Sequence, residues 1–311
     1  MQKLAVNKNQ YRGVPISVDA PDLSALLPTV RDAVISPRTK RAYYAALREF
    51  IEFNGGGELG HTSVLAFRQH LVDRGLASAS VNLALSAVRK LADEAERQGL
   101  ITERAWRQIK GVQGMRSRGV STGNWLTEEQ ALALLTAPDQ STVSGRRDFV
   151  LLSLLIGCGM RREEAVNVRC DQVVERSGRL VLLDVEGKGR KIRTLAVPRW
   201  LDQPLRDWMA EIRDRGTIVR RVWRGGEVAE EGITGEAVRQ IVGHYCQQLG
   251  IKAAPHDLRR TFALQALDGG ATVESVRQAL GHSSLATTTR YVAAVDALRN
   301  PACDFMFGGG K

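Results

Sequence analysis

The feature that most constrains the fold is a change of hydrophobic pattern along the chain. Apolar residues recur with helical spacing before residue 120, and no strand pattern occurs there. Runs rich in β-branched residues come later, within residues 171–197. A chain of 311 residues suffices for about two domains at roughly 100–200 residues each. The pattern therefore predicts a mainly α protein with a small antiparallel β-sheet in its second domain.

The N-terminal part predicts a helical domain over residues 21–111. Residues 1–20 have no clear periodicity, and we expect a flexible N-terminus there. Ser36 followed by Pro37 predicts a helix start, and the glycines after Asn54 predict its end. The expected helices cover residues 22–34 (kinked or split at Pro28), 37–54, 62–73, 80–99 and 102–110.

A basic segment separates the two expected domains. No acidic residue occurs from Arg104 to Leu126, whereas Arg116 and Arg118 add positive charge and several glycines interrupt the stretch. We expect residues 112–125 to form a flexible linker that follows a nucleic-acid backbone, because phosphate contacts provide most nonspecific affinity. An ordinary solvated loop is the alternative.

The second domain is expected over residues 126–311. Thr127 and Gln130 have the spacing of a capping box. Three short strands are expected at residues 173–174, 180–185 and 192–197, joined by turns at Ser177-Gly178 and Gly187-Lys188-Gly189, with a further hairpin tip near residues 224–226. The expected helices cover residues 127–137, 147–156, a segment from residue 160, 200–215, 235–249, 257–267, 273–280 and 285–294.

Residues with phosphate-directed chemistry are concentrated between His256 and Tyr291. His256 and Arg259 are three residues apart and share a face of a helix. His282 follows a glycine at an expected helix end, and Tyr291 lies nine residues further on. Two histidines, an arginine and a tyrosine suit reaction at a phosphodiester.

This stretch resembles the C-terminal signature of the tyrosine recombinase (phage integrase) family, in which His-x-x-Arg and Leu-Gly-His precede a tyrosine nine residues after the histidine. Gly159-Met160-Arg161 with Glu164 resembles the first catalytic patch of that family, and the Gly-Lys-Gly turn at Lys188 resembles the second. The resemblance implies a two-domain architecture, with a helical core-binding domain and an α+β catalytic domain. Because about 35 residues precede the helical module, it points to simple Xer-like or Cre-like members.

The resemblance also implies the role of each residue. Tyr291 is the nucleophile, Arg161 and Arg259 hold the phosphate oxygens, and Glu164 supports Arg161. Lys188 protonates the leaving 5′ oxygen, and His256 and His282 bond the phosphate or relay protons. An isolated Gly-Lys-Gly turn would by itself be a solvent-exposed loop. No metal or nucleotide cofactor is expected.

The overall charge of +10 suggests a polyanionic partner. We expect double-stranded DNA with inverted half-sites, bound by a homotetramer that is a monomer or weak oligomer when free. The candidate DNA contacts are Lys40, Arg41, Arg89, Lys90, Arg116 and Arg118. The four cysteines have no Cys-x-x-Cys spacing, and no apolar run of about 18 residues is present, so a cytoplasmic protein with reduced thiols is expected.

Three functions remain open at this point. The first is site-specific DNA recombination through a 3′-phosphotyrosine, and the second is a type IB topoisomerase activity, which shares the chemistry without exchanging partners. The third is a DNA-binding protein without cleavage activity. The complete set of catalytic residue types favours the first two.

The C-terminal segment has apolar residues, including Val295, Leu298 and Phe305. We expect residues 295–307 to pack on a neighbouring subunit in a cyclic, head-to-tail manner when the protein is assembled on DNA. The alternative is packing on its own domain in every state.

Overall fold

The computed structural model describes residues 23–116, 124–187, 191–282, 288–289 and 291–292. The chain divides into two compact units, residues 1–120 and residues 121–311. Each unit has its own hydrophobic core among the described residues. Lys188, Arg118 and the C-terminal segment 295–307 lie outside the described part. None of the described helices is long and apolar enough to cross a membrane.

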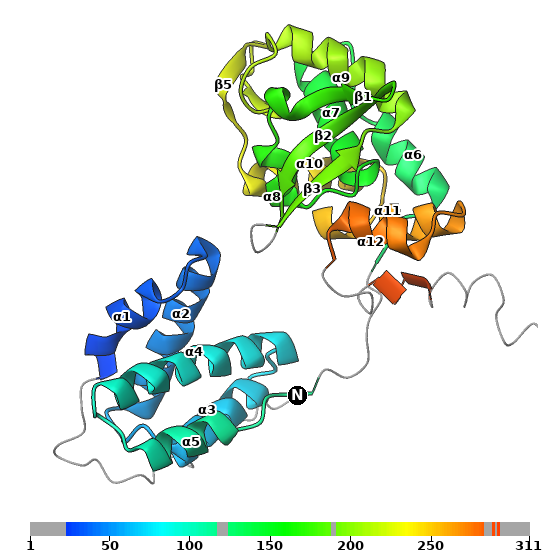
Figure 1. The fold of residues 1–311 in the computed structure, drawn as a ribbon. Coiled ribbons are helices and arrows are strands. Elements are labelled where there is room, and N and C mark those ends of the chain that lie inside the picture. The colour runs from blue at the N-terminus through cyan, green and yellow to red at the C-terminus, as the bar shows by residue number, and fades with distance from the viewer. Residues whose placement is uncertain (1–22, 117–123, 188–190, 283–287, 290, 293–311) are drawn as a thin grey trace, which may run out of the picture. The chain divides into compact units, whose positions relative to one another are not determined.

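Every described element of the first unit is helical (Figure 1). Ser36 caps the long second helix, which ends at Gly55 in the left-handed conformation, so the predicted start and stop are confirmed. The first predicted helix is divided at Leu26, just before Pro28, into a 3-10 turn and a short α-helix. The elements are η1 Leu23–Leu26, α1 Leu27–Asp32, α2 Pro37–Asn54, α3 His61–Asp73, α4 Ser78–Arg97 and α5 Glu103–Gly111.

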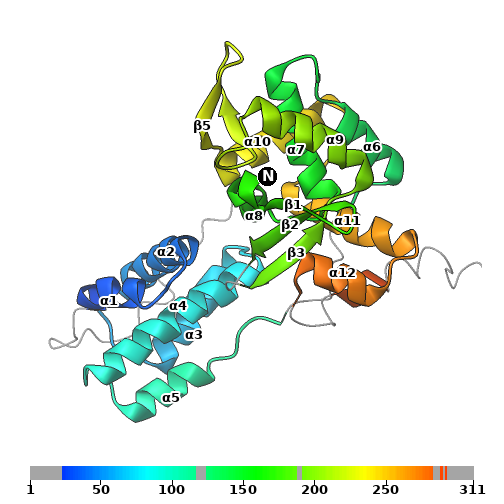
Figure 2. The ribbon, with the colours of Figure 1, turned by 45° about the horizontal axis from the view of Figure 1, so that its top comes forward.

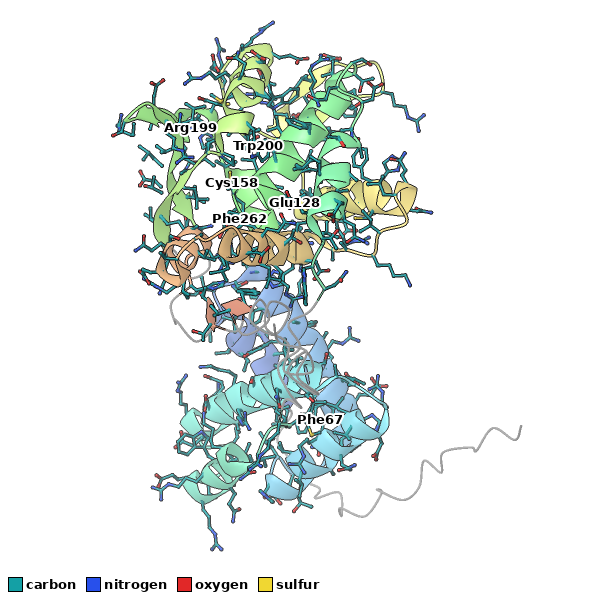
Figure 3. The ribbon with its side chains drawn as sticks, turned by 90° about the vertical axis from the view of Figure 1, so that its right-hand side faces the viewer. Phe67, Glu128, Cys158, Arg199, Trp200 and Phe262 are labelled. Carbon is teal, nitrogen blue, oxygen red and sulfur yellow. The ribbon has the colours of Figure 1, made fainter. Side chains whose placement is uncertain are left out.

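The core of the first unit lies between α2, α3 and α4. Phe67 on α3, labelled in Figure 3, is fully buried. Its ring packs against the rings of Phe50 and Phe53 on α2. Val81, Leu85, Val88 and Leu91 recur every three or four residues on the buried face of α4. This helical spacing is the reason that the sequence predicted these elements.

The segment after α5 remains attached to the first unit. Asn82 on α4 donates to the Met115 carbonyl at 2.9 Å and accepts from the Met115 amide at 2.7 Å. Arg68 donates to the Gln113 carbonyl, and Arg89 donates to the Val112 carbonyl. The first residues of the expected linker are therefore held by side chains of α3 and α4.

The second unit combines helices with two small antiparallel sheets. Its helices are α6 Glu128–Thr136, α7 Val143–Ile156, α8 Arg162–Asn167, α9 Arg199–Glu211, α10 Gly235–Gln248, α11 Pro255–Asp268 and α12 Val273–Leu280. Its strands are β1 Val173–Arg176, β2 Arg179–Glu186, β3 Ile192–Ala196, β4 Arg220–Val222 and β5 Val228–Gly232. The predicted mainly α fold with small antiparallel sheets is confirmed.

Two helix boundaries differ most from the sequence prediction. Helix α7 begins four residues earlier than expected, because Thr142 caps it by accepting from the Gly145 amide at 3.0 Å. Helix α9 ends at Glu211 rather than near residue 215, because Arg213 and Asp214 adopt positive φ angles that are incompatible with a continuing helix.

The three-stranded sheet has the order β1-β2-β3, and its β2–β3 register shifts between Leu182 and Val185. Asp184 at this shift has a φ of 51°, which is typical of a β-bulge. Helix α12 packs beside β3, and α11 packs against both α7 and α12 (Figure 2). This arrangement brings the ends of α8, β3, α11 and α12 together.

Candidate active site

Arg161 and Glu164 form one unit at the start of α8. Arg161 is the N-cap residue, and its backbone amide donates to Glu164 Oε2 at 2.8 Å. Its guanidinium Nη1 donates to Glu164 Oε1 at 2.7 Å. The preceding turn is tight, since Gly159 has a φ of +59° and a side chain there would collide with the ring of Phe262 on α11. Phe262 is labelled in Figure 3. This turn therefore fixes the position of Arg161 at the start of α8.

Glu164 is a buried carboxylate surrounded by guanidinium groups. Arg193 on β3 donates to both of its oxygens, at 3.1 and 2.7 Å, and Arg259 Nη1 lies 3.9 Å from Oε2. Burial alone would raise the pKa of Glu164, but the hydrogen bonds from Arg193 and Arg161 lower it to about 2. Glu164 is therefore ionised at neutral pH and holds several positive charges close together.

Arg193 was not among the site residues predicted from the sequence. A signal was present in the strand pattern, because Arg193 and Leu195 occupy the inward-facing positions of β3 while their neighbours are exposed. A charged residue on the inward face of a strand requires a buried partner. Its partner Glu164 is 29 residues away, so the sequence alone did not identify the pair.

Arg259 is almost completely buried on α11. Its Nη1 donates to the Gly159 carbonyl at 2.6 Å, and its Nη2 donates to the Leu280 carbonyl. Burial and the nearby charge of Arg161 lower the pKa of Arg259 to about 9, against the opposing effect of Glu164. The guanidinium thus connects the turn before α8 with the end of α12.

His282 follows the left-handed cap of α12, Gly281, which has a φ of 62°. Its Nδ1 lies 3.0 Å from the Thr288 hydroxyl oxygen. Burial, followed by the charges of Arg259 and Arg161, lowers the pKa of His282 to about 4. The imidazole is therefore neutral at pH 7, as a residue that accepts and returns protons requires.

His256 lies in the first turn of α11, so the predicted helix face shared with Arg259 is confirmed. Desolvation lowers its pKa, as do the positive charges of Arg260 and Arg259. The positive charges of Arg259 and Arg161 thus act on both histidines of the predicted site.

Tyr291 packs on the core formed by α11 and α12, and only 9% of its surface is exposed. Its ring stacks on the His282 ring, with centroids 6.4 Å apart and an interplanar angle of 23°. It also interacts electrostatically with Arg259. The candidate nucleophile thus lies beside the histidine and arginine groups of its own chain.

A cationic hollow adjoins these residues. Arg161 and His282 line it together with Lys191, Arg193, Arg277 and Gln278. Arg277 also donates to the His282 carbonyl at 2.9 Å, which fixes the turn after α12. No group of three or more His, Cys, Asp or Glu side chains among the described residues is arranged as metal ligands. The hollow has the charge needed for an anionic substrate such as a phosphodiester.

The candidate DNA contacts of the first unit have different environments. Lys40 on α2 lies 3.6 Å from Asp32, and Lys90 on α4 lies 4.0 Å from Asp93. Arg89 is partly buried, and its guanidinium donates to the Val112 carbonyl at 2.5 Å. The last two described candidates are exposed, Arg41 on α2 and Arg116 after α5. Their contact with DNA stays a prediction.

Comparison with known proteins identifies the family. The phage integrase family matches residues 124–297, and the N-terminal SAM-like domain of phage integrases matches residues 23–99. Tyrosine recombinase XerA of Thermococcus kodakarensis is 30% identical over 271 residues, which cover 85% of this chain and 88% of that protein. Tyrosine recombinase XerD of Pseudomonas aeruginosa is 30% identical over 273 residues, covering 83% and 87% of the two chains.

Solved structures show the same fold. The XerH site-specific recombinase bound to its palindromic difH substrate superposes with a TM-score of 0.72 at 19% identity, covering 91% of this chain and 83% of that one. A lambda integrase dimer bound to a COC′ core site gives a TM-score of 0.67 at 17% identity, covering 86% and 75%. The chain belongs to the phage integrase, or tyrosine recombinase, family, which confirms the resemblance drawn from the sequence.

Proposed function

We propose that this tyrosine recombinase cleaves one strand of duplex DNA through Tyr291 and rejoins it to a strand of a second duplex. The Tyr291 oxygen forms a bond to phosphorus as the bond between phosphorus and the 5′ oxygen breaks. The products are a 3′-phosphotyrosine and a free 5′-hydroxyl, and attack by another 5′-hydroxyl reverses the step. The observation that carries this proposal is the packing of Tyr291 against His282 beside Arg259, within one unit.

The arginines supply the charge that the reaction needs. The transition state has five oxygens around phosphorus and more negative charge on the nonbridging oxygens than the substrate. Arg161 and Arg259 are held by Glu164 and by backbone carbonyls before any substrate binds, so little reorganisation is required. A planar guanidinium also matches the geometry of two phosphate oxygens.

The histidines are suited to proton transfer. A tyrosine hydroxyl has a reference pKa of about 10, so attack requires a group that takes its proton. The pKa values of both His256 and His282 are below the ordinary value, which leaves a neutral imidazole available at pH 7. His282 is stacked on the Tyr291 ring, so we assign it the role of base or relay for Tyr291.

Lys188 is assigned as the proton donor to the leaving 5′ oxygen. It lies outside the described residues, but the flanking residues close the hairpin, with the Gly187 amide donating to the Lys191 carbonyl at 2.7 Å. We expect Lys188→Ala to slow cleavage of normal DNA by about 100-fold or more, because this is the usual contribution of a general acid. A substrate with a 5′-bridging sulfur needs no protonation and should restore the rate. Lack of restoration would remove Lys188 from this role. Lys252→Ala is the control, because Lys252 is an exposed lysine of the same unit.

The partner and assembly follow from the same function. We propose double-stranded DNA with inverted half-sites as the substrate, bound in the cytoplasm by four copies of the chain with two active at a time. The 30% identity to Xer recombinases over most of the chain supports this proposal. Arg41 and Arg116 are exposed and suited to phosphate contact in this complex.

The nucleophile is tested with Tyr291→Phe on a nicked suicide substrate. The substitution keeps the ring that packs on His282 and removes the attacking oxygen. The wild type should form an SDS-resistant protein–DNA adduct, and the variant should form none while binding DNA normally. An adduct with the Phe variant would show that another residue attacks. Recombinant products from paired substrates distinguish recombination from nicking and resealing alone.

A further inference from the structure

Arg193 joins three segments that converge on the site. Its Nη1 and Nη2 donate to the two oxygens of Glu164 at 3.1 and 2.7 Å, and its Nε donates to the Ala279 carbonyl at 2.8 Å. Its side chain is only about 10% exposed. One guanidinium therefore connects β3, the start of α8 and the last turn of α12, which lie together in Figure 2.

Each joined segment carries a group of the proposed reaction. The start of α8 presents Arg161, and the end of α12 leads through Gly281 to His282. Strand β3 follows the hairpin that contains Lys188. A shift of any one segment would change the distance between groups that must act on the same phosphate.

The surroundings of Arg193 leave little room for alternative positions. A Cβ atom at Gly281 would lie 3.1 Å from Arg193 Cδ, and one at Gly187 would lie 3.2 Å from Arg193 Nη1. Glycine at both positions allows the backbone to approach the guanidinium closely. Local packing and three hydrogen bonds thus hold Arg193 in one conformation.

Arg193 also determines how the two carboxylate oxygens of Glu164 are shared among the neighbouring guanidinium groups. Arg161 contributes one guanidinium nitrogen, Nη1, to Glu164, whereas Arg193 contributes two. Without Arg193, the buried carboxylate would be balanced by Arg161 and Arg259 alone, and their donors would be drawn towards it. Arg193 thereby occupies both oxygens of Glu164, which limits how many donors Arg161 directs to that carboxylate.

We propose that Arg193 is a positioning residue for DNA cleavage, which holds Glu164 and the end of α12 so that Arg161 and His282 act on the same phosphate. This proposal rests on the proposed function. Arg193 lines the cationic hollow, but its three guanidinium nitrogens already bond Ala279 and Glu164, so it is assigned no contact with the reacting atoms. Its loss should therefore change the cleavage rate without changing the DNA affinity.

The test uses the full chain, a nicked suicide substrate and two substitutions. Arg193→Met keeps the length of the side chain and removes every donor, whereas Arg193→Lys keeps the charge but cannot bond Glu164 twice and Ala279 as well. At saturating protein, the Met variant should cleave about 10- to 100-fold more slowly, as expected for misplaced reacting groups, with a Kd for DNA within about threefold of wild type. The Lys variant should have an intermediate rate.

The pH profile separates positioning from a loss of folded protein. Removing the cation of Arg193 raises the pKa of Glu164, so cleavage by folded Met variant should decline with acid at a higher pH than in wild type. The proposal would be overturned if the cleavage rate and the DNA binding of the Met variant both fell in proportion to its fraction of folded protein. Should the Met variant not fold, a Lys variant with the wild-type rate and pH profile would overturn it equally.

Arg206→Met is the matched control, because Arg206 on α9 also pairs with two carboxylates but remains exposed. It should cleave at the wild-type rate. The wild-type protein tests the proposed function separately, because the absence of a covalent adduct with the wild type would refute that function. An adduct formed equally fast by wild type and Arg193→Met, across the pH range, refutes only the role of Arg193.

Discussion

The two units differ in what they bury. Among the described residues of the first unit, the buried side chains are apolar apart from Ser63. The described residues of the second unit include five buried charged side chains, which are Arg147, Asp148, Glu164, Arg220 and Arg259. Burying a charge is unfavourable unless partners compensate for the lost hydration. The first unit is therefore organised by apolar packing, and the second is also organised around fixed charges.

Two buried carboxylates of the second unit show that burial alone does not decide whether a carboxylate pKa rises or falls. Glu164 is bonded by Arg161 and Arg193, and its pKa falls to about 2. Asp148 is bonded by Arg147 and the Tyr245 hydroxyl, yet desolvation dominates and its pKa is raised. One guanidinium and one hydroxyl thus do not lower the pKa of buried Asp148. The guanidinium donors of two arginines at the candidate active site do lower the pKa of buried Glu164.

The largest expected effect tests the apolar unit. Phe67→Ala removes a fully buried ring that contacts Phe50 and Phe53, and should destabilise the first unit by about 3–5 kcal/mol. Urea unfolding should show an earlier transition for this unit and an unchanged one for the second. Leu65→Ala on the same helix is the control, because Leu65 is exposed. A shift of both transitions together would show that the units do not unfold independently.

A second effect tests the charged unit through acid titration. The folded pKa of Glu164, about 2, is below the ordinary value of 4.5, so the ionised carboxylate stabilises the folded state above pH 4.5. That stability, about 3 kcal/mol, is lost as the pH falls from 4.5 towards 2. The difference in unfolding free energy between wild type and Glu164→Gln should shrink over this range. A constant difference would mean that ionisation of Glu164 does not stabilise the fold.

The smallest effect concerns Thr288, a fully buried threonine beside His282. Thr288→Val keeps the shape but removes the hydroxyl that lies 3.0 Å from His282 Nδ1. Loss of one such contact is worth about 1 kcal/mol, so adduct formation should slow by about 5- to 10-fold at unchanged DNA affinity. Thr136→Val, whose hydroxyl bonds within α6, should have the wild-type rate. An unchanged rate for Thr288→Val would show that His282 is oriented by other groups.

Local features of this protein were determined by the sequence. The capping box of Thr127 and Gln130, the Ser36-Pro37 helix start and the helix end at Gly281 were predicted and are confirmed. These signals act between residues three or four apart, so neighbouring sequence suffices to define them. The family signature likewise lies in short motifs whose spacing is visible along the chain.

Only the tertiary structure decided which distant groups meet. Glu164 pairs with Arg193 on another element, Arg259 bonds the carbonyls of Gly159 and Leu280, and Arg89 bonds the carbonyl of Val112. Such pairs depend on how helices and strands pack, and hydrophobic spacing specifies which face is buried but not which polar partner faces it. The sequence therefore identified the candidate reacting residues, whereas packing determined the charges and hydrogen bonds that hold them in place.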